Sequence, residues 1–95
     1  MKDANKIKLV TADTLVKSGM GEIYQVTFAC NDAAPTAGTI DIYDGVSAAG
    51  TKIYSETFTT TAFRAYTIFL NAAVTNGIYV DFTTTADVNA VVTYS

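Results

Sequence analysis

The sequence predicts an all-β domain, an antiparallel β-sandwich of about seven or eight strands with jelly-roll or immunoglobulin-like connections. Three observations lead to this prediction. Short runs of alternating apolar and polar residues recur along the 95 residues, with turn residues between them. Sixteen Thr suit a half-buried pleated surface, whereas only two Glu are available for helix surfaces. No window has the 3.6-residue apolar period of a helix. A small β-barrel is the alternative.

Four strands are expected in the first half of the chain. They cover residues 7–10, 14–17, 22–30 and 39–44. Gly19 and Gly21 separate the second strand from the third, because glycine readily adopts the positive φ of a tight turn. The loop before residues 39–44 contains Pro35, the only proline, among small turn-forming residues.

The third predicted strand is long enough to define two faces. Alternation places Tyr24, Val26, Phe28 and Cys30 on one face and Ile23 on the other. Cys30 is therefore expected to be a small buried apolar side chain, since no basic residue nearby would activate its thiol.

Four more strands are expected in the second half. They cover residues 52–58, 63–70, 78–82 and 88–94. Residues 63–70 are apolar on both faces, which predicts a strand that is covered on both. Residues 71–77 are expected to be a turn region because they end in Asn76-Gly77, a strong turn signal.

The predicted core consists of the apolar positions on the inner faces of these strands. It comprises Val26, Phe28, Ile40, Ile42, Ile53, Phe69, Ile78, Val80, Phe82, Val88 and Val92. A chain of this length with no linker or charge block is expected to form a single β domain over residues 1–95, in which residues 1–8 are a flexible or interface arm.

Composition argues against most enzyme classes. The chain has no His, the commonest general base and metal ligand, and its single Cys cannot build a thiolate metal site. We therefore expect a protein that is not an enzyme, with no catalytic residue, cofactor or metal. Asp41 and Asp81 are expected to be exposed, and Asp44 and Asp87 are expected to bond their own backbone in turns. A calcium ion on Asp44 or Asp87 is the one metal alternative left open.

Charge and hydropathy also restrict the partners and the compartment. The net charge of −3, without a basic stretch, disfavours nucleic acid. No run of about 18 apolar residues suggests a membrane span, and residues 1–6 lack the apolar stretch of a secretory signal. We therefore expect a product made in the cytoplasm that binds neither nucleic acid nor membrane.

Two groups of residues are candidates for an interface. Tyr is enriched in protein interfaces and in platforms on which sugars stack, and four Tyr lie on the middle strands. Because only 16% of the residues are charged, part of the surface is expected to be covered by a neighbour, which favours a homo-oligomer. The candidate interface residues are Lys2, Lys6, Lys8, Tyr43, Tyr54, Tyr66 and Tyr79.

Two segments give a resemblance to known proteins. The first reads Gly38-Thr39-Ile40-Asp41-Ile42-Tyr43-Asp44-Gly45, continuing at residues 48–53, and the second covers residues 76–82 and 86–94. These segments resemble phrases in small Thr/Ala-rich virion structural proteins of tailed bacteriophages, which are β-sandwiches of the decoration and head or neck and tail accessory types. The resemblance implies a structural role in a repeated assembly.

The expected function is that of a virion structural protein, a capsid decoration or cement protein that acts through subunit contacts. Its partners would be other virion proteins, chiefly the major capsid protein, and it would be localised in the virion after synthesis in the host cytoplasm. The alternative is a carbohydrate- or receptor-binding module on a phage fibre or tail, in which the same tyrosines stack on sugars beside Asp and Asn side chains.

Overall fold

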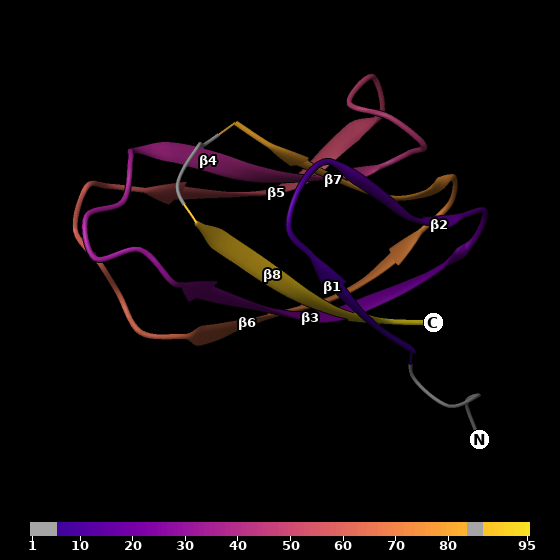
Figure 1. Ribbon diagram of the computed structural model, residues 1–95. Coiled ribbons are helices and arrows are strands. Elements are labelled where there is room, and N and C mark those ends of the chain that lie inside the picture. Colours follow the sequence, from indigo (N-terminus) through magenta and orange to yellow (C-terminus); the bar gives the residue numbers. More distant parts are fainter. Residues whose placement is uncertain (1–5, 84–86) are drawn as a thin grey trace.

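The computed structural model describes residues 6–83 and 87–95, which form two four-stranded antiparallel sheets facing one another (Figure 1). The eight strands are β1 (Lys6–Val10), β2 (Thr14–Ser18), β3 (Gly21–Cys30), β4 (Gly38–Asp44), β5 (Thr51–Phe58), β6 (Tyr66–Val74), β7 (Gly77–Phe82) and β8 (Val88–Tyr94). The predicted all-β sandwich is confirmed.

The strand order is that of a jelly roll. Sheet A has the order β1-β8-β3-β6 and sheet B the order β2-β7-β4-β5. The chain therefore behaves as one long hairpin in which β1 pairs with β8, β2 with β7, β3 with β6 and β4 with β5, wound so that successive pairs alternate between the sheets. Of the two connection patterns expected, the structure has the jelly roll.

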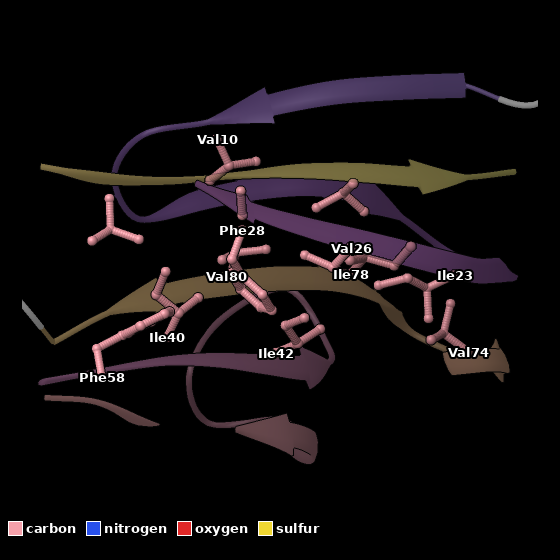
Figure 2. Close-up of a cluster of buried hydrophobic side chains, with 13 residues drawn as sticks. Val10, Ile23, Val26, Phe28, Ile40, Ile42, Phe58, Val74, Ile78 and Val80 are labelled. Atoms are coloured by element: carbon pink, nitrogen blue, oxygen red, sulfur yellow. The ribbon is translucent and has the colours of Figure 1, made fainter. Parts of the chain in front are cut away.

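The core lies between the sheets, and the side chains labelled in Figure 2 converge there from both. Most of the predicted core residues are buried, and Ile53 and Phe82 are half-buried against them. Each fully buried Val, Ile or Phe side chain contributes about 1.5–3 kcal/mol. The buried set is Val10, Ile23, Val26, Phe28, Ile40, Ile42, Phe58, Val74, Ile78, Val80, Val88, Ala90 and Val92.

Phe69 is the core prediction that was wrong, since its side chain is 69% exposed. The strand begins at Tyr66 rather than at residue 63, and β6 is an edge strand of sheet A with only β3 beside it. Tyr66 and Ile68 face the core, so Phe69 points to the outside. The prediction that this segment is covered on both faces therefore fails for the single chain.

A bulge changes which residues of β3 face inward. The register shifts between Ile23 and Gln25 against both neighbouring strands, so Ile23 and Val26 are both fully buried although strict alternation separates them. On β6 the same irregularity includes Asn71, whose φ is 47°. This strand continues to Val74, where a turn was predicted, and less and more exposed residues alternate along it without a break.

Candidate functional site

Each sheet turns one face inward and the other outward, and the two outer faces are the candidate binding surfaces. On sheet A, three rows of outward residues run across the strands: Leu9–Val91–Thr27–Thr67, Ile7–Thr93–Gln25–Phe69, and Asn89–Ala29. We call these ten residues the neutral face, because none of them is charged. On sheet B, the outward residues around Tyr43, Tyr79, Asp41 and Asp81 form a second surface, which we call the Tyr–Asp face.

The neutral face combines exposed apolar side chains at its edges with small polar ones at its centre. Ile7 and Leu9 on β1 are 70% and 57% exposed, and Phe69 on β6 is 69% exposed. Between them, the hydroxyls of Thr27 and Thr67 are hydrogen-bonded at 2.7 Å. This is an uncharged surface across four strands, half of whose ten residues are polar, with exposed apolar side chains on both edge strands. Exposed apolar side chains make it a candidate site of association.

The neutral face ends at the bulge in β3. Glu22 lies opposite Ala73 beyond that bulge, and its carboxylate accepts a hydrogen bond of 2.9 Å from the Tyr24 hydroxyl. Tyr24 also donates to the hydroxyl of Ser95 at 3.1 Å. The Glu22 carboxylate therefore lies beyond the three rows, while Lys6 and Lys8 alternate with Ile7 and Leu9 along β1.

The Tyr–Asp face is built on the two central strands of sheet B. Tyr43 lies directly opposite Tyr79 and Asp41 directly opposite Asp81, since β4 and β7 are antiparallel. The Lys52 ammonium is 3.5 Å from the Asp41 carboxylate and 5.8 Å from the centre of the Tyr43 ring. Aromatic rings, carboxylates and an ammonium are thus presented together.

Asp41 is outward-facing but not exposed, and the expectation of exposure was wrong. Only 6% of the residue is accessible, because Lys52 and Ser55 from edge strand β5 cover it. The Ser55 hydroxyl donates a short hydrogen bond to the Asp41 carboxylate. A buried carboxylate with an ion pair and a hydrogen bond has its polar groups satisfied, so the main role of Asp41 is to stabilise the packing of β5 on β4.

The carboxylates of the Tyr–Asp face affect one another. Burial, followed by the neighbouring Asp13 and Asp41 carboxylates, raises the pKa of Asp81, and Lys52 opposes this effect. The pKa of the Tyr79 hydroxyl is also raised, chiefly by burial and then by Asp13 and Asp81. Asp13 itself accepts a hydrogen bond of 2.6 Å from the Phe82 amide.

The remaining predicted interface residues occupy different environments. Lys6 and Lys8 are exposed on edge strand β1, alternating with Ile7 and Leu9, and Lys2 lies outside the described residues. Tyr54 and Tyr66 are half-buried, and both hydroxyls donate to the Glu56 carboxylate, Tyr66 at 2.7 Å and Tyr54 through a shorter bond. The structure therefore brings Tyr43 together with Tyr79, and Tyr54 together with Tyr66, in two separate places.

Two surface pockets lie at the loops of sheet B and its connection to β6. A depression of about 610 Å³ at the β4–β5 loop is bordered by Asp44, whose carboxylate bonds the backbone of the β6–β7 turn. A smaller one, of about 270 Å³, lies beside Phe58, Phe63 and Tyr66. The Phe58 and Phe63 rings stack with their centroids 5.3 Å apart, and the Tyr66 ring is tilted against Phe63, so the pocket borders an aromatic cluster of the core.

Within residues 6–83 and 87–95 no group of three or more acidic or Cys side chains is arranged to hold a metal ion. The same residues include no helix of the length and hydropathy that a membrane span requires. No family model, curated protein or solved structure matches this chain.

The neutral face was missed by the sequence reasoning, which placed the interface on tyrosines and lysines. A signal for it was present. Residues 23–31, 65–80 and 88–95 contain no charged residue, and these segments supply three of the four strands of sheet A. Adjacent charge-free strands leave a charge-free outer face, but only the strand order shows that they are adjacent.

Proposed function

We propose that this chain is a non-enzymatic structural protein of a virion, a capsid decoration protein that acts through contacts with neighbouring subunits. The observation that carries the proposal is the neutral face, where Ile7, Leu9 and Phe69 are exposed on an uncharged four-stranded surface. A single domain gains nothing from keeping such a surface in water, whereas a subunit of an assembly buries it.

Two further features support this proposal. The segments that resemble phage proteins, at residues 38–53 and 76–94, include strands β4, β7 and β8. Each of these is a central strand of its sheet, with a neighbouring strand on both sides. Jelly rolls occur in viral capsid proteins and in lectins, which agrees with either role as an analogy of fold. The partners would be other virion proteins, chiefly the major capsid protein, and the protein would be localised in the virion.

Mass spectrometry of virions purified from the source of this gene tests the proposal. We expect the chain to be present in many copies per particle, because a decoration protein follows the repeats of the capsid. Purified protein added to particles that lack it should bind, and a Phe69→Lys variant should not. A Val46→Lys variant, altered at a loop residue that is 56% exposed, is the matched control and should bind. Absence of the chain from virions would contradict the proposal.

A second candidate function, binding of a carbohydrate receptor, is favoured by the Tyr–Asp face. The Tyr43–Tyr79 pair offers aromatic surface for a sugar ring, and the adjacent Asp81 and Lys52 offer an acceptor and a donor for its hydroxyls. A glycan array tests it. Binding that is lost in Tyr79→Ala but kept in Phe69→Lys would favour this function over the first.

A further inference from the structure

The turn that joins β6 to β7 contains a chemically labile dipeptide. Asn76 is exposed and is followed by Gly77, and these residues form the only Asn-Gly pair in the sequence. In an unrestrained chain the nitrogen of such a glycine attacks the Asn side chain readily, because glycine has no side chain to hinder it. We propose that Asn76 is a site of spontaneous deamidation and that the Asp44 carboxylate restrains this reaction in the folded chain. This inference goes beyond the proposed function and does not depend on it.

The reaction at Asn76 needs water and no other reagent. The Gly77 nitrogen loses its proton and bonds to Cγ of Asn76, while the bond from Cγ to the side-chain nitrogen breaks and ammonia leaves with the proton. The succinimide ring that remains adds water at one of its two carbonyls. One opening gives an aspartate, and the other gives an isoaspartate, whose main chain is one carbon longer. Water reaches this residue because Asn76 borders the open depression at the β4–β5 loop.

Hydrogen bonds on both sides fix the peptide group that has to move. The Asn76 carbonyl accepts a hydrogen bond of 3.0 Å from the Gly19 amide. The Gly77 amide, which is the attacking group, bonds the Asp44 carboxylate, and so does the Asn76 amide, at 2.8 Å. To reach Cγ, the Gly77 nitrogen must turn about the Cα–C bond of Asn76, and this rotation breaks the bonds to Gly19 and Asp44. The reaction therefore requires local opening of the turn.

The charge of Asp44 opposes the same step. The amides of Asn76, Thr75 and Gly77, in that order of effect, hold the pKa of Asp44 below its ordinary value. A carboxylate with a lowered pKa is a poor base for an amide proton, so Asp44 accepts the hydrogen bond without removing the proton. The anion that forms at the Gly77 nitrogen during attack would also lie beside a carboxylate that stays ionised, and like charges repel.

Asp44 itself precedes a glycine, so the protection is mutual. An Asp-Gly pair forms the same succinimide when the Gly45 nitrogen attacks a protonated Asp44 carboxyl and water leaves. The Gly45 amide donates instead to the Gly77 carbonyl at 3.2 Å, and the lowered pKa keeps Asp44 ionised. The two labile dipeptides, Asp44-Gly45 and Asn76-Gly77, therefore hold each other in unreactive conformations.

The fold requires the glycine that makes Asn76 reactive. Gly77 has a φ of 148°, and a Cβ at this position would lie 2.6 Å from the Lys17 carbonyl oxygen and 2.8 Å from that of Gly45. A larger residue after Asn76 would slow the attack, but the close approach of these backbone segments leaves no room for one. The labile pair is thus tied to the packing of β2 and β4 against β7.

Incubation of the purified chain at mildly alkaline pH, followed by peptide mapping with mass spectrometry, tests the proposal. The map separates peptides that carry asparagine, aspartate or isoaspartate at position 76. We expect Asn76 to deamidate more slowly in the folded chain than in guanidinium chloride, by a factor on the order of a hundred. A folded wild type that deamidates as fast as the unfolded chain would overturn the proposal without reference to any variant.

Asp44→Ala tests the role of the carboxylate. Alanine is chosen because asparagine at this position would create a second Asn-Gly pair with Gly45. In the folded variant, deamidation at Asn76 should be about tenfold faster than in the folded wild type, because the attacking amide has lost its charged acceptor. An unchanged rate would overturn the proposal.

Val10→Ala separates this effect from a general loss of stability. Val10 is fully buried on β1 in the row that contains Ala90 and Phe28, away from the β6–β7 turn. Denaturant unfolding confirms that both variants fold and measures the stability that each one loses. Val10→Ala should leave the rate at Asn76 in the folded chain unchanged. Equal acceleration in both variants would show that global unfolding, and not Asp44, controls the reaction, and would overturn the proposal.

Discussion

The Asp44 carboxylate at the end of β4 accepts a hydrogen bond of 2.8 Å from the backbone amide of Asn76, a residue far along the chain. The same carboxylate accepts from the Thr75 amide at 3.0 Å. The tight turn between β6 in sheet A and β7 in sheet B is thereby fastened to β4. These amides, that of Asn76 first, hold the pKa of Asp44 below its ordinary value of 3.8.

Asp44→Asn should destabilise the fold at neutral pH, because the amide is a weaker acceptor than the carboxylate. The pKa of Asp44 is lower in the folded state than in the unfolded state. Its contribution to the free energy of unfolding is therefore present above about pH 4 and is lost as pH falls through the folded-state pKa. Urea unfolding at several pH values should show wild type and variant converging in acid. A difference that stays constant down to pH 2 would contradict this assignment.

Asp81→Asn should stabilise the fold at neutral pH. The pKa of Asp81 is raised in the folded state, chiefly by burial and then by Asp13. Ionisation of Asp81 therefore lowers the free energy of unfolding, and this loss develops as pH rises through the folded-state pKa. We expect a higher Tm for the variant at pH 7 and equal Tm values near pH 3. Asp87→Asn, at an exposed position before β8, is the control and should leave the Tm unchanged.

Substitution by alanine should lower the free energy of unfolding strongly at Phe28 and hardly at all at Phe69. Phe28→Ala empties a fully buried site in contact with the Phe58 and Tyr66 rings, which costs about 3–5 kcal/mol. That is a large part of the total stability of about 5–10 kcal/mol expected for a domain of this size. Phe69→Ala should change the free energy of unfolding of the monomer by about 0.5 kcal/mol or less. Dilute samples in urea measure both, and equal losses would contradict the assignment of Phe69 to the surface.

Glu56 should control how Tyr54 and Tyr66 ionise. Burial first, and then the bonded Glu56 carboxylate, raise the pKa of Tyr54 to about 12 and raise that of Tyr66 as well. In the unfolded state tyrosines ionise near pH 10. The neutral Tyr54 and Tyr66 hydroxyls therefore add to the free energy of unfolding below that pH, and this addition is lost as pH rises through their folded-state pKa values. In Glu56→Gln, ultraviolet absorbance should show both ionising at lower pH, and unchanged titration would contradict the link.

The sequence by itself determined the strands. Alternation and turn residues located seven of them to within one residue at each end, whereas β6 was placed three to four residues too early. The inner faces of β4 and β7 followed directly, since Ile40, Ile42, Ile78 and Val80 are fully buried as expected. The regular period of two in these strands relates side-chain direction to sequence position without further information. The expectation that Asp44 bonds its own turn was wrong, because its carboxylate accepts hydrogen bonds from the amides of Thr75 and Asn76 in the turn between β6 and β7.

The tertiary structure decided which outer face each strand contributes to, and whether that face is covered. Phe69 was expected to be buried because residues 63–70 are apolar on both sides, yet β6 lies at an edge of sheet A, where one side remains open. Ile23 is buried only because a bulge resets the alternation of β3. Ile7, Leu9 and Phe69 share a face because β1 and β6, distant in sequence, are joined through β8 and β3. Strand pairing is a long-range property, so local alternation does not contain it.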